Sequence, residues 1–207
     1  GDLHVHTDWS DGASSLAEMA GAARELGYEY LVISDHSQSL GVARGLNAER
    51  QRAQRAEIDA LNEGWHDFRL LQGCELEIKA DGSLDLPDDV LARLDLVVAS
   101  LHTSQRQDRE QITRRMLNAV TSPYVDVIGH PSGRILGQRE ESAVDLDAVI
   151  EAAAASGTAL EVNATPSRLD LDDVHVRRAI GLGVKIAVNS DAHHPDGLEN
   201  LAYGVAT

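Results

Sequence analysis

Two hydrophobic patterns alternate along almost the whole chain. Short, nearly continuous apolar runs have the length and composition of buried strands, and they fall at residues 3–5, 30–34, 68–78, 94–100, 125–129, 159–163 and 184–190. Between them, apolar residues recur three and four positions apart, which is typical of amphipathic helices, at residues 15–27, 47–64, 109–120, 145–157 and 172–183. Apolar strands separated by helices indicate a parallel sheet covered by helices.

Local signals support these element boundaries. Ser15 is followed three residues later by Glu18, which is the capping-box spacing, and Gly27 is a stop signal for the same helix. The pair Asp81–Gly82 predicts a hairpin turn that leads to a short partner strand. Because no linker or low-complexity stretch interrupts the pattern, we expect one domain over residues 1–207.

Polar residues follow the apolar runs in a regular way. The strand ends carry, in chain order, His4 and His6, Asp35 and His36, Glu75, His102, His130, Asn163, and Asp191 and His193. In a β/α barrel all these ends meet at one face, whereas in an open sheet they spread along an edge. The distribution therefore favours an α/β fold of the TIM-barrel type, with mainly parallel strands and about seven β/α units.

The residue types at this face are those of a metal site. Residues i and i+2 of a strand point the same way, so His4 and His6 can ligate one cation together. Neutral imidazole suits Zn, Mn or Fe, and a carboxylate can bridge two cations. Six histidines with Asp11, Glu75 and Asp191 give nine candidate ligands, which is too many for one ion and suits two or three.

Composition narrows the class of protein. The formal net charge of −16 argues against a protein that holds nucleic acid by bulk electrostatics, and it suits one that holds several cations. Cys74 is the only cysteine, so a reducing cytoplasm is compatible and we expect a cytoplasmic protein. No apolar stretch is long enough to span a membrane. The first residue is Gly and the last residues resemble the start of a helix, so we expect a piece of a longer protein.

Six short motifs resemble those of the PHP (polymerase and histidinol phosphatase) family of metal-dependent phosphoesterases. They are "DLHVHTDWSDG", "ISDHS", "GCELEI", "SLHTS", "IGHPSGR" and "NSDAH", in this order over the whole chain. The resemblance implies a distorted barrel of seven β/α units with three divalent ions, Mn²⁺ and/or Zn²⁺, or alternatively Fe. The implied ligands are His4, His6, Glu75 and Asp191 for the first ion, Glu75, His102 and His130 for the second, and Asp11, His36 and His193 for the third. Position 11 varies between His and Asp in the family.

Within the family, three stretches are most similar to the C-terminal PHP domain of bacterial family X DNA polymerases. They are "DHSQSLGVARGL", "GHPSGRILGQRE" and "EVNATPSRLDL". This resemblance implies a preceding nucleotidyltransferase (polymerase) half, and 3′→5′ exonuclease activity with related 3′-phosphatase and abasic-site endonuclease activities. The substrates would be single-stranded or gapped DNA 3′ ends in DNA repair, attacked by a metal-activated hydroxide.

Roles for individual residues follow from these expectations. Glu75, His102 and Asp191 are the ligands that we expect hydrolysis to depend on most. The candidates for binding substrate phosphate are Arg44, Arg134, Arg168 and His194. Asp35 either orients a ligating histidine or is a plain loop carboxylate. The alternatives are a small-molecule phosphomonoesterase of the histidinol-phosphatase type and a non-catalytic structural module.

Overall fold

The computed structural model describes residues 1–207, and its strands form one parallel sheet in which sheet order equals chain order. Each strand pairs with the next along the chain through parallel ladders. The strands are β1 (Asp2–Val5), β2 (Tyr30–Ile33), β3 (Arg69–Glu77), β4 (Leu96–Ser100), β5 (Val127–Ile128), β6 (Ala159–Asn163) and β7 (Ile186–Asn189). All seven expected strands are confirmed, and β5 is shorter than its apolar run indicates.

The sheet curls until its two edge strands meet, which makes a nearly closed barrel. The amide of His6 donates to the carbonyl of Ala192 at 2.8 Å, and Val5 and Ala192 form a single parallel bridge. Farther from the mouth, side chains join the edges: the Asn189 carboxamide accepts from the Leu3 amide at 3.3 Å. Backbone pairing therefore closes the barrel only near its mouth. The expected distorted barrel of seven units is confirmed.

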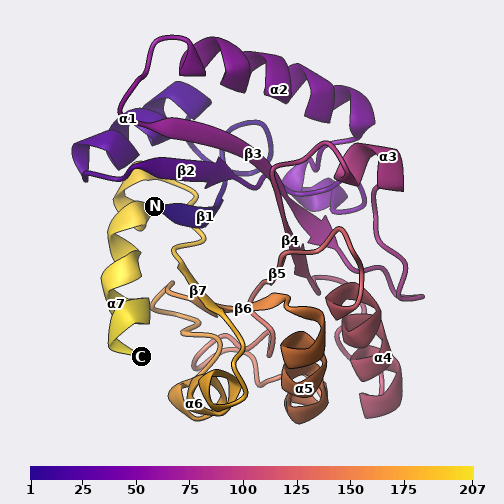
Figure 1. The fold of residues 1–207 in the computed structure, drawn as a ribbon. Coiled ribbons are helices and arrows are strands. Elements are labelled where there is room, and N and C mark those ends of the chain that lie inside the picture. Colours follow the sequence, from indigo (N-terminus) through magenta and orange to yellow (C-terminus); the bar gives the residue numbers. More distant parts are fainter.

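Helices cover the outside of this barrel (Figure 1). They are α1 (Leu16–Glu25), α2 (Ala48–Asn62), α3 (Asp88–Leu91), α4 (Arg109–Val120), α5 (Leu146–Ser156), α6 (Asp173–Gly181) and α7 (Leu201–Ala206), with 3₁₀ turns at Gly41–Ala43 and Pro195–Asn200. The expected capping box of Ser15 and Glu18 begins α1. None of these helices combines the length and apolar character that crossing a bilayer requires.

The expected hairpin between β3 and β4 forms only in part. The turn at Asp81–Gly82 forms, but the partner strand is reduced to one antiparallel bridge between Ile78 and Leu84. The short helix α3, which the hydrophobic pattern did not predict, then leads into β4. A four-residue helix has too few apolar positions to produce a recognisable period.

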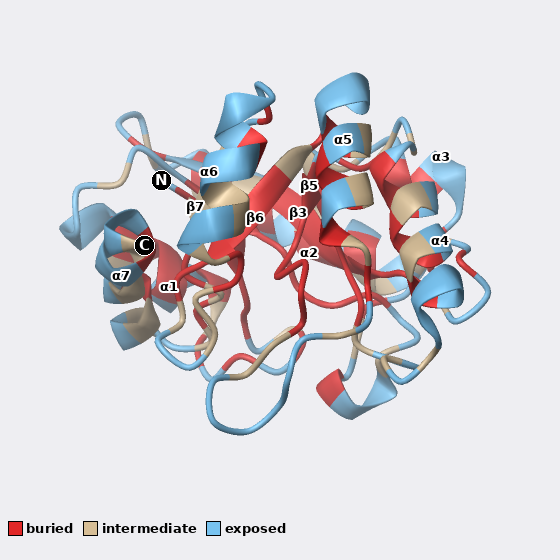
Figure 2. Cartoon of the chain, turned by 90° about the horizontal axis from the view of Figure 1, so that it is seen from below, coloured by how far each residue is buried: buried red, intermediate tan, exposed pale blue.

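The hydrophobic core lies mainly between the strands and the helices rather than inside the barrel. A cluster of 24 buried residues joins β3–β7 to the helices around them, and a cluster of 12 joins β1–β3 to α1 and α2. A third and smaller cluster of Val98, Val127 and Ala187 lies on the inner face of the sheet. Figure 2 shows the buried strands in red behind helices whose outer faces are exposed. Buried polar side chains such as Glu75 and Glu161 share this inner face.

Candidate metal centre

The nine expected metal ligands come from the strand ends that meet at the mouth of the barrel. His4 lies in β1 and His6 directly follows it, so both imidazoles point to the same side of the strand. Glu75 lies inside β3, the longest strand, and its backbone bridges to His36 at the end of β2. The rest follow β4, β5 and β7 or lie in the loop after β1, and they are His102, His130, Asp191, His193 and Asp11. The structure brings all nine into one cluster.

Glu75 is the centre of this cluster. Its carboxylate is 1% exposed, and each oxygen faces imidazole nitrogens. The contacts are Oε2 to His4 Nε2 (3.2 Å), His6 Nε2 (3.4 Å) and His36 Nδ1 (2.9 Å), and Oε1 to His102 Nε2 (3.1 Å) and His130 Nε2 (2.9 Å). One carboxylate in contact with five histidines from four other strand ends is suited to bridge two cations.

Two further carboxylates complete the cluster on its other sides. Asp191 Oδ1 lies 3.1 Å from His6 Nε2 and 3.7 Å from His4 Nε2. Asp11 lies 3.4 Å from His193 Nε2 and 3.5 Å from His36 Nε2. Three overlapping groups of donor atoms result, each compact enough to surround one ion, and they are His4–His6–Glu75, His36–Glu75–His102 and His6–Asp11–His36–His193.

Several imidazole nitrogens in the cluster are placed for metal coordination rather than for hydrogen bonding. His4 Nε2, both ring nitrogens of His6, and His36 Nδ1 are buried and form no hydrogen bond. Several of them nevertheless lie 2.9–3.4 Å from carboxylate oxygens. Buried polar atoms are normally hydrogen-bonded. Donor atoms that crowd together without alignment are expected where each points at a shared cation, so this donor set fits divalent metal ions.

The pKa values in the cluster are set mainly by burial and by the charges of neighbouring ligands. Burial works to raise the pKa of Glu75, but the surrounding imidazoles of His102, His4 and His36 overcome it and hold that pKa well below its usual range. Burial works to lower the pKa of His36 and of His102, but the Glu75 charge raises them to about 10 and about 9. Without an ion, both imidazoles therefore carry a proton.

His6 behaves in the opposite way. Burial and the neighbouring His36 and His193 lower its pKa to about 3. The ring is therefore neutral over the whole physiological range and can ligate without first losing a proton. The centre thus contains one preformed neutral ligand beside others, His36 and His102 among them, that a cation must deprotonate.

Two buried glutamates, which the sequence analysis did not identify, orient ligating histidines from behind. Glu161 of β6 accepts from His4 Nδ1 at 2.7 Å, and Glu77 of β3 accepts from His102 Nδ1 at 2.8 Å. These contacts place the proton on Nδ1 and leave Nε2 facing the cluster. The available signal was an acidic residue inside an apolar strand, as in "ELE" at 75–77 and "LEV" at 160–162.

Asp35 takes neither of the two roles considered for it. Its carboxylate is fully buried and contacts no histidine. It accepts from the Thr7 amide at 2.8 Å, the Thr7 hydroxyl at 2.6 Å and the Gln54 amide group at 2.6 Å, and Ser10 Oγ also donates to it. Asp35 therefore fixes the loop between His6 and Asp11, which sets the position of Asp11 relative to the other ligands.

A cavity of about 320 Å³, the metal cavity, opens above the cluster. Its lining residues are Asp11, His36, Leu40, Val42, Ala43, Glu75, His102, His130, Arg168, Asp191 and His193. Of the four expected substrate-binding residues, Arg168 alone lines it. Its Nε lies 3.8 Å from Asp191 Oδ2, and its Nη1 is buried without a hydrogen-bond partner.

The other three expected substrate-binding residues lie outside the metal cavity. The Arg134 guanidinium donates to the carbonyls of Arg168 and Leu169, the former at 3.0 Å, so it supports the backbone that carries Arg168. Arg44 is exposed in a left-handed conformation after the 3₁₀ turn. His194 caps the next 3₁₀ turn through its ring, which is 58% exposed. The sequence placed these side chains near the strand ends, but the direction in which each one points depends on its loop.

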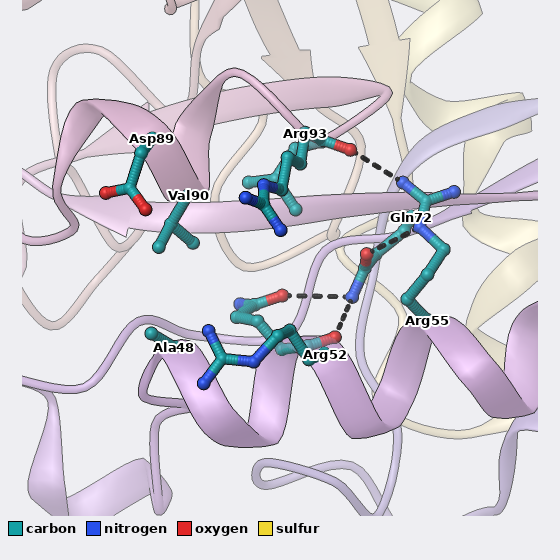
Figure 3. Close-up of a pocket in the computed structure, with 9 residues that line it drawn as sticks. Ala48, Arg52, Arg55, Gln72, Asp89, Val90 and Arg93 are labelled. Carbon is teal, nitrogen blue, oxygen red and sulfur yellow. Dashed lines mark hydrogen bonds between the residues drawn. The ribbon is translucent and has the colours of Figure 1, made fainter.

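A smaller cavity of about 140 Å³ lies between α2 and α3 and contains none of the candidate ligands. Figure 3 shows it with Arg52, Arg55 and Arg93. Arg55 donates to Gln72 at 2.9 Å, to the Arg93 carbonyl at 3.0 Å and to Asp95 at 2.7 Å, which ties α2 to the start of β4. This cavity is therefore separate from the metal centre.

Comparisons with known proteins agree with this geometry. The chain is 49% identical over 205 residues to the DNA polymerase/3′-5′ exonuclease PolX of Bacillus subtilis, a match that covers 99% of this chain and 36% of that protein. It is 34% identical over 203 residues to a probable phosphatase of Thermoanaerobacter sp., covering 93% of this chain and 78% of that protein. The chain thus spans about a third of the length of PolX and most of the phosphatase.

The fold has a solved counterpart. A histidinol phosphate phosphatase from Lactococcus lactis, complexed with zinc, L-histidinol and phosphate, superimposes with a TM-score of 0.70 at 16% identity, covering 99% of this chain and 92% of that one. At this identity the likeness concerns the fold. A family model for the PHP domain matches residues 2–165. With 49% identity to PolX and a barrel that gathers the nine expected ligands, this chain belongs to the PHP domain family.

Proposed function

We propose that this chain is a metal-dependent phosphoesterase whose reaction takes place in the metal cavity. One observation carries the proposal: the buried Glu75 carboxylate is in contact with five imidazoles, and two more carboxylates flank them. A donor set of this size and mixture suits several divalent cations. It opens onto a cavity where the Arg168 guanidinium has an unpartnered N–H, which suits an anionic substrate.

The ions that these residues would hold supply an activated water and neutralise the charge of the phosphoryl oxygens. The chain's own residues prepare that chemistry. Glu75 and Asp191 place their charge at the centre of the cluster, and Glu77 and Glu161 fix the ring orientation of His102 and His4. We therefore assign Glu75, His102 and Asp191 as the residues on which hydrolysis depends most.

Arg168 is the group that would hold the phosphate. A buried guanidinium N–H without an acceptor is costly, and a phosphate oxygen in the metal cavity would satisfy it. Asp191 lies close enough to the same guanidinium to keep it in place. The phosphate would then lie between the guanidinium and the ligand cluster.

We further propose that the substrate is DNA with an accessible 3′ end, single-stranded or gapped, and that the main activity is 3′→5′ exonucleolytic. Related 3′-phosphatase and abasic-site endonuclease activities would use the same cavity, in DNA repair. The 49% identity to PolX supports this choice. This chain spans 36% of PolX. We therefore also propose that a polymerase half with nucleotidyltransferase activity belongs to the same full-length protein.

We propose three divalent ions for the centre, the first held by His4, His6, Glu75 and Asp191, the second by Glu75, His102 and His130, and the third by Asp11, His36 and His193. Mixed imidazole and carboxylate ligands accept Mn²⁺, Zn²⁺ or Fe, and availability decides among them. Elemental analysis of the purified chain measures both the number and the type of ion.

The decisive experiment compares metal-stripped chain with chain reloaded with Mn²⁺ or Zn²⁺. A 5′-labelled single-stranded oligonucleotide should shorten from its 3′ end after reloading, and His102→Ala in a parallel preparation should lose that activity. If the reloaded chain and the His102→Ala variant degrade the oligonucleotide equally, the activity belongs to a contaminant and the proposal fails.

A small-molecule phosphomonoesterase is the second candidate. The 34% identity to a probable phosphatase of which the chain covers 78% favours it, and a cavity of about 320 Å³ has room for a small monoester. Turnover of histidinol phosphate by the reloaded chain, with an intact oligonucleotide in the parallel reaction, would favour this activity over the nuclease.

A further inference from the structure

A second cavity lies between the loops that follow the ligands His102 and His130, and we call it the flanking cavity. It has a volume of about 580 Å³ and contains no hydrophobic lining residue. Its residues are Ser104, Gln105, Arg106, Arg139, Glu140, Glu141 and Ser142. The first three follow His102 after β4 and the others follow His130 after β5, so two ligand-bearing loops form its walls. The Gln105 amide nitrogen lies 3.7 Å from the Cβ position of Gly133, which places the loops side by side.

Two guanidiniums in the flanking cavity form no ion pair, although the charge of the buried Asp170 also acts on Arg139. The ion pairs of this region join Arg134 to Glu141 and Asp172, and Arg168 to Asp191, and none of them involves Arg139 or Arg106. Arg139 is nevertheless held in place, because its Nε donates to the Gly133 carbonyl at 2.7 Å. Both side chains are exposed, so in this chain with a net charge of −16 they are available to an anionic ligand.

Each of the two cavities offers an arginine to an anion. Arg168 lines the metal cavity with an unpartnered Nη1, and Arg139 lines the flanking cavity. Burial and the charge of Arg168 lower the pKa of Arg139, and the charge of Asp170 raises it. A substrate with two neighbouring phosphates would therefore meet one guanidinium in each cavity.

Two acidic residues also line the flanking cavity. Arg134 lies 3.5 Å from Glu141 and reduces the effect of its charge, although Arg134 also faces Asp172. Glu140 has no ion-pair partner and opposes an anion, so its removal should strengthen binding. The hydroxyl of Ser142 is buried without a hydrogen-bond partner and adds a neutral donor.

We propose that the flanking cavity binds the phosphodiester next to the one being cleaved, with Arg139 and Arg106 as its anion-binding side chains. This inference rests on the proposed phosphoesterase function and deepens it. A substrate with one phosphate would reach the metal cavity alone, whereas a single-stranded oligonucleotide would occupy both cavities. No bond forms or breaks in the flanking cavity. It contributes affinity for the DNA strand and positions the cleaved phosphodiester in the metal cavity.

The test uses Mn²⁺-reloaded chain and two substrates, a single-stranded oligothymidylate and thymidine 5′-monophosphate p-nitrophenyl ester, which has one phosphodiester and no neighbour. In Arg139→Gln the ratio of the oligonucleotide KM to the small-diester KM should rise about fivefold, the factor expected for one partly exposed charged pair. Adding Arg106→Gln should raise the ratio further. The plot of log(kcat/KM) for the oligonucleotide against log salt should become shallower by about 0.7 for each arginine that no longer neutralises a phosphate.

Two other variants sharpen the test. Glu140→Gln should lower the oligonucleotide KM about twofold, because it removes a repulsive charge at the surface. Arg93→Gln removes an exposed, unpaired arginine from the cavity between α2 and α3 (Figure 3), and it should leave the ratio and the salt slope unchanged. Thermal melting confirms that each variant is folded.

Three outcomes reject the inference in distinguishable ways. If wild type cleaves both substrates and Arg139→Gln leaves the KM ratio and the salt slope at wild-type values, the flanking cavity has no such role and the proposed function stands. If wild type cleaves the small diester alone, the chain is a phosphoesterase without a neighbouring-phosphate site. If wild type cleaves neither, the proposed function itself fails.

Discussion

The layer between helices and barrel and the ligand cluster at the mouth of the barrel are both largely buried, but they differ in what fills them. The layer holds two apolar clusters of 24 and 12 residues. The mouth holds charged and polar groups such as Glu75, Glu77 and Glu161, each at most 1% exposed. Burying carboxylates is costly unless they are paired. The layer therefore accounts for stability, whereas the mouth has the composition of the proposed metal site.

The two regions should respond differently to single substitutions. Volume and apolar area govern the layer, so a truncation there lowers the free energy of unfolding. Charge and orientation govern the mouth, so an isosteric change there acts on metal content and rate.

The largest effect is expected from Glu75→Gln. The substitution keeps the shape of the side chain and removes the charge that five imidazoles face. Hydrolysis should fall by at least about a thousandfold, because loss of a bridging ligand removes metal and transition-state charge stabilisation together. Elemental analysis should find fewer ions per chain, and far-UV circular dichroism should remain that of wild type.

Ile112→Ala in α4 is the matched change in the apolar layer. Ile112 is fully buried, and its truncation should lower the free energy of unfolding by about 2–5 kcal/mol. At a temperature where the variant is folded, its metal content should equal that of wild type. Loss of metal in Ile112→Ala, or full metal content and activity in Glu75→Gln, would contradict the separation of the two regions.

A smaller effect is expected from Glu161→Gln. Glu161 accepts from His4 Nδ1 at 2.7 Å and does not line the metal cavity. The amide holds the ring less firmly, and metal affinity should fall about 10–100-fold, the usual cost of losing such a support. Competition with a chelator of known affinity measures the loss. An unchanged affinity would show that the barrel alone orients His4.

A graded effect is expected from pH. In the ion-free chain the pKa values of His36 and His102 are raised to about 10 and about 9, so both rings are protonated at pH 7 and a cation must displace those protons. Metal affinity should therefore rise with pH, by about tenfold per unit for each proton displaced, up to these pKa values. Calorimetry at pH 6.5, 7.5 and 8.5, in buffers of different ionisation enthalpy, counts the protons released. Affinity that is independent of pH, without proton release, would contradict the protonated state.

Most of the fold could be predicted because hydrophobic periodicity reports directly which residues face the apolar layer. Continuous apolar runs predicted all seven strands, and the capping box of Ser15 and Glu18 predicted the start of α1. The short α3 and the single bridge after β3 were not predicted, because segments of this length contain too few positions for a period.

The nine ligand positions were predictable from alternation within a strand and from the common direction of parallel strand ends. Glu77 and Glu161 also lie in strands but were not identified. A carboxylate that accepts a hydrogen bond from a metal-binding histidine has no distinctive spacing along the chain. Arg115 shows a related limit. It is a buried arginine of α4 whose partners include the carbonyls of Lys79 and Thr103, contacts that exist only once the loops after β3 and β4 have packed.

The amino-acid order alone thus fixed the strands, the helices and the set of residues able to hold cations, because both patterns depend on the local geometry of a strand or a helix. The roles of the remaining polar residues depend on how distant segments pack. Arg168 lines the metal cavity, Arg134 supports the backbone of Arg168, and Asp35 holds the loop before Asp11 in place. The direction of a loop side chain depends on contacts between residues far apart along the chain, and local periodicity contains no information about such contacts.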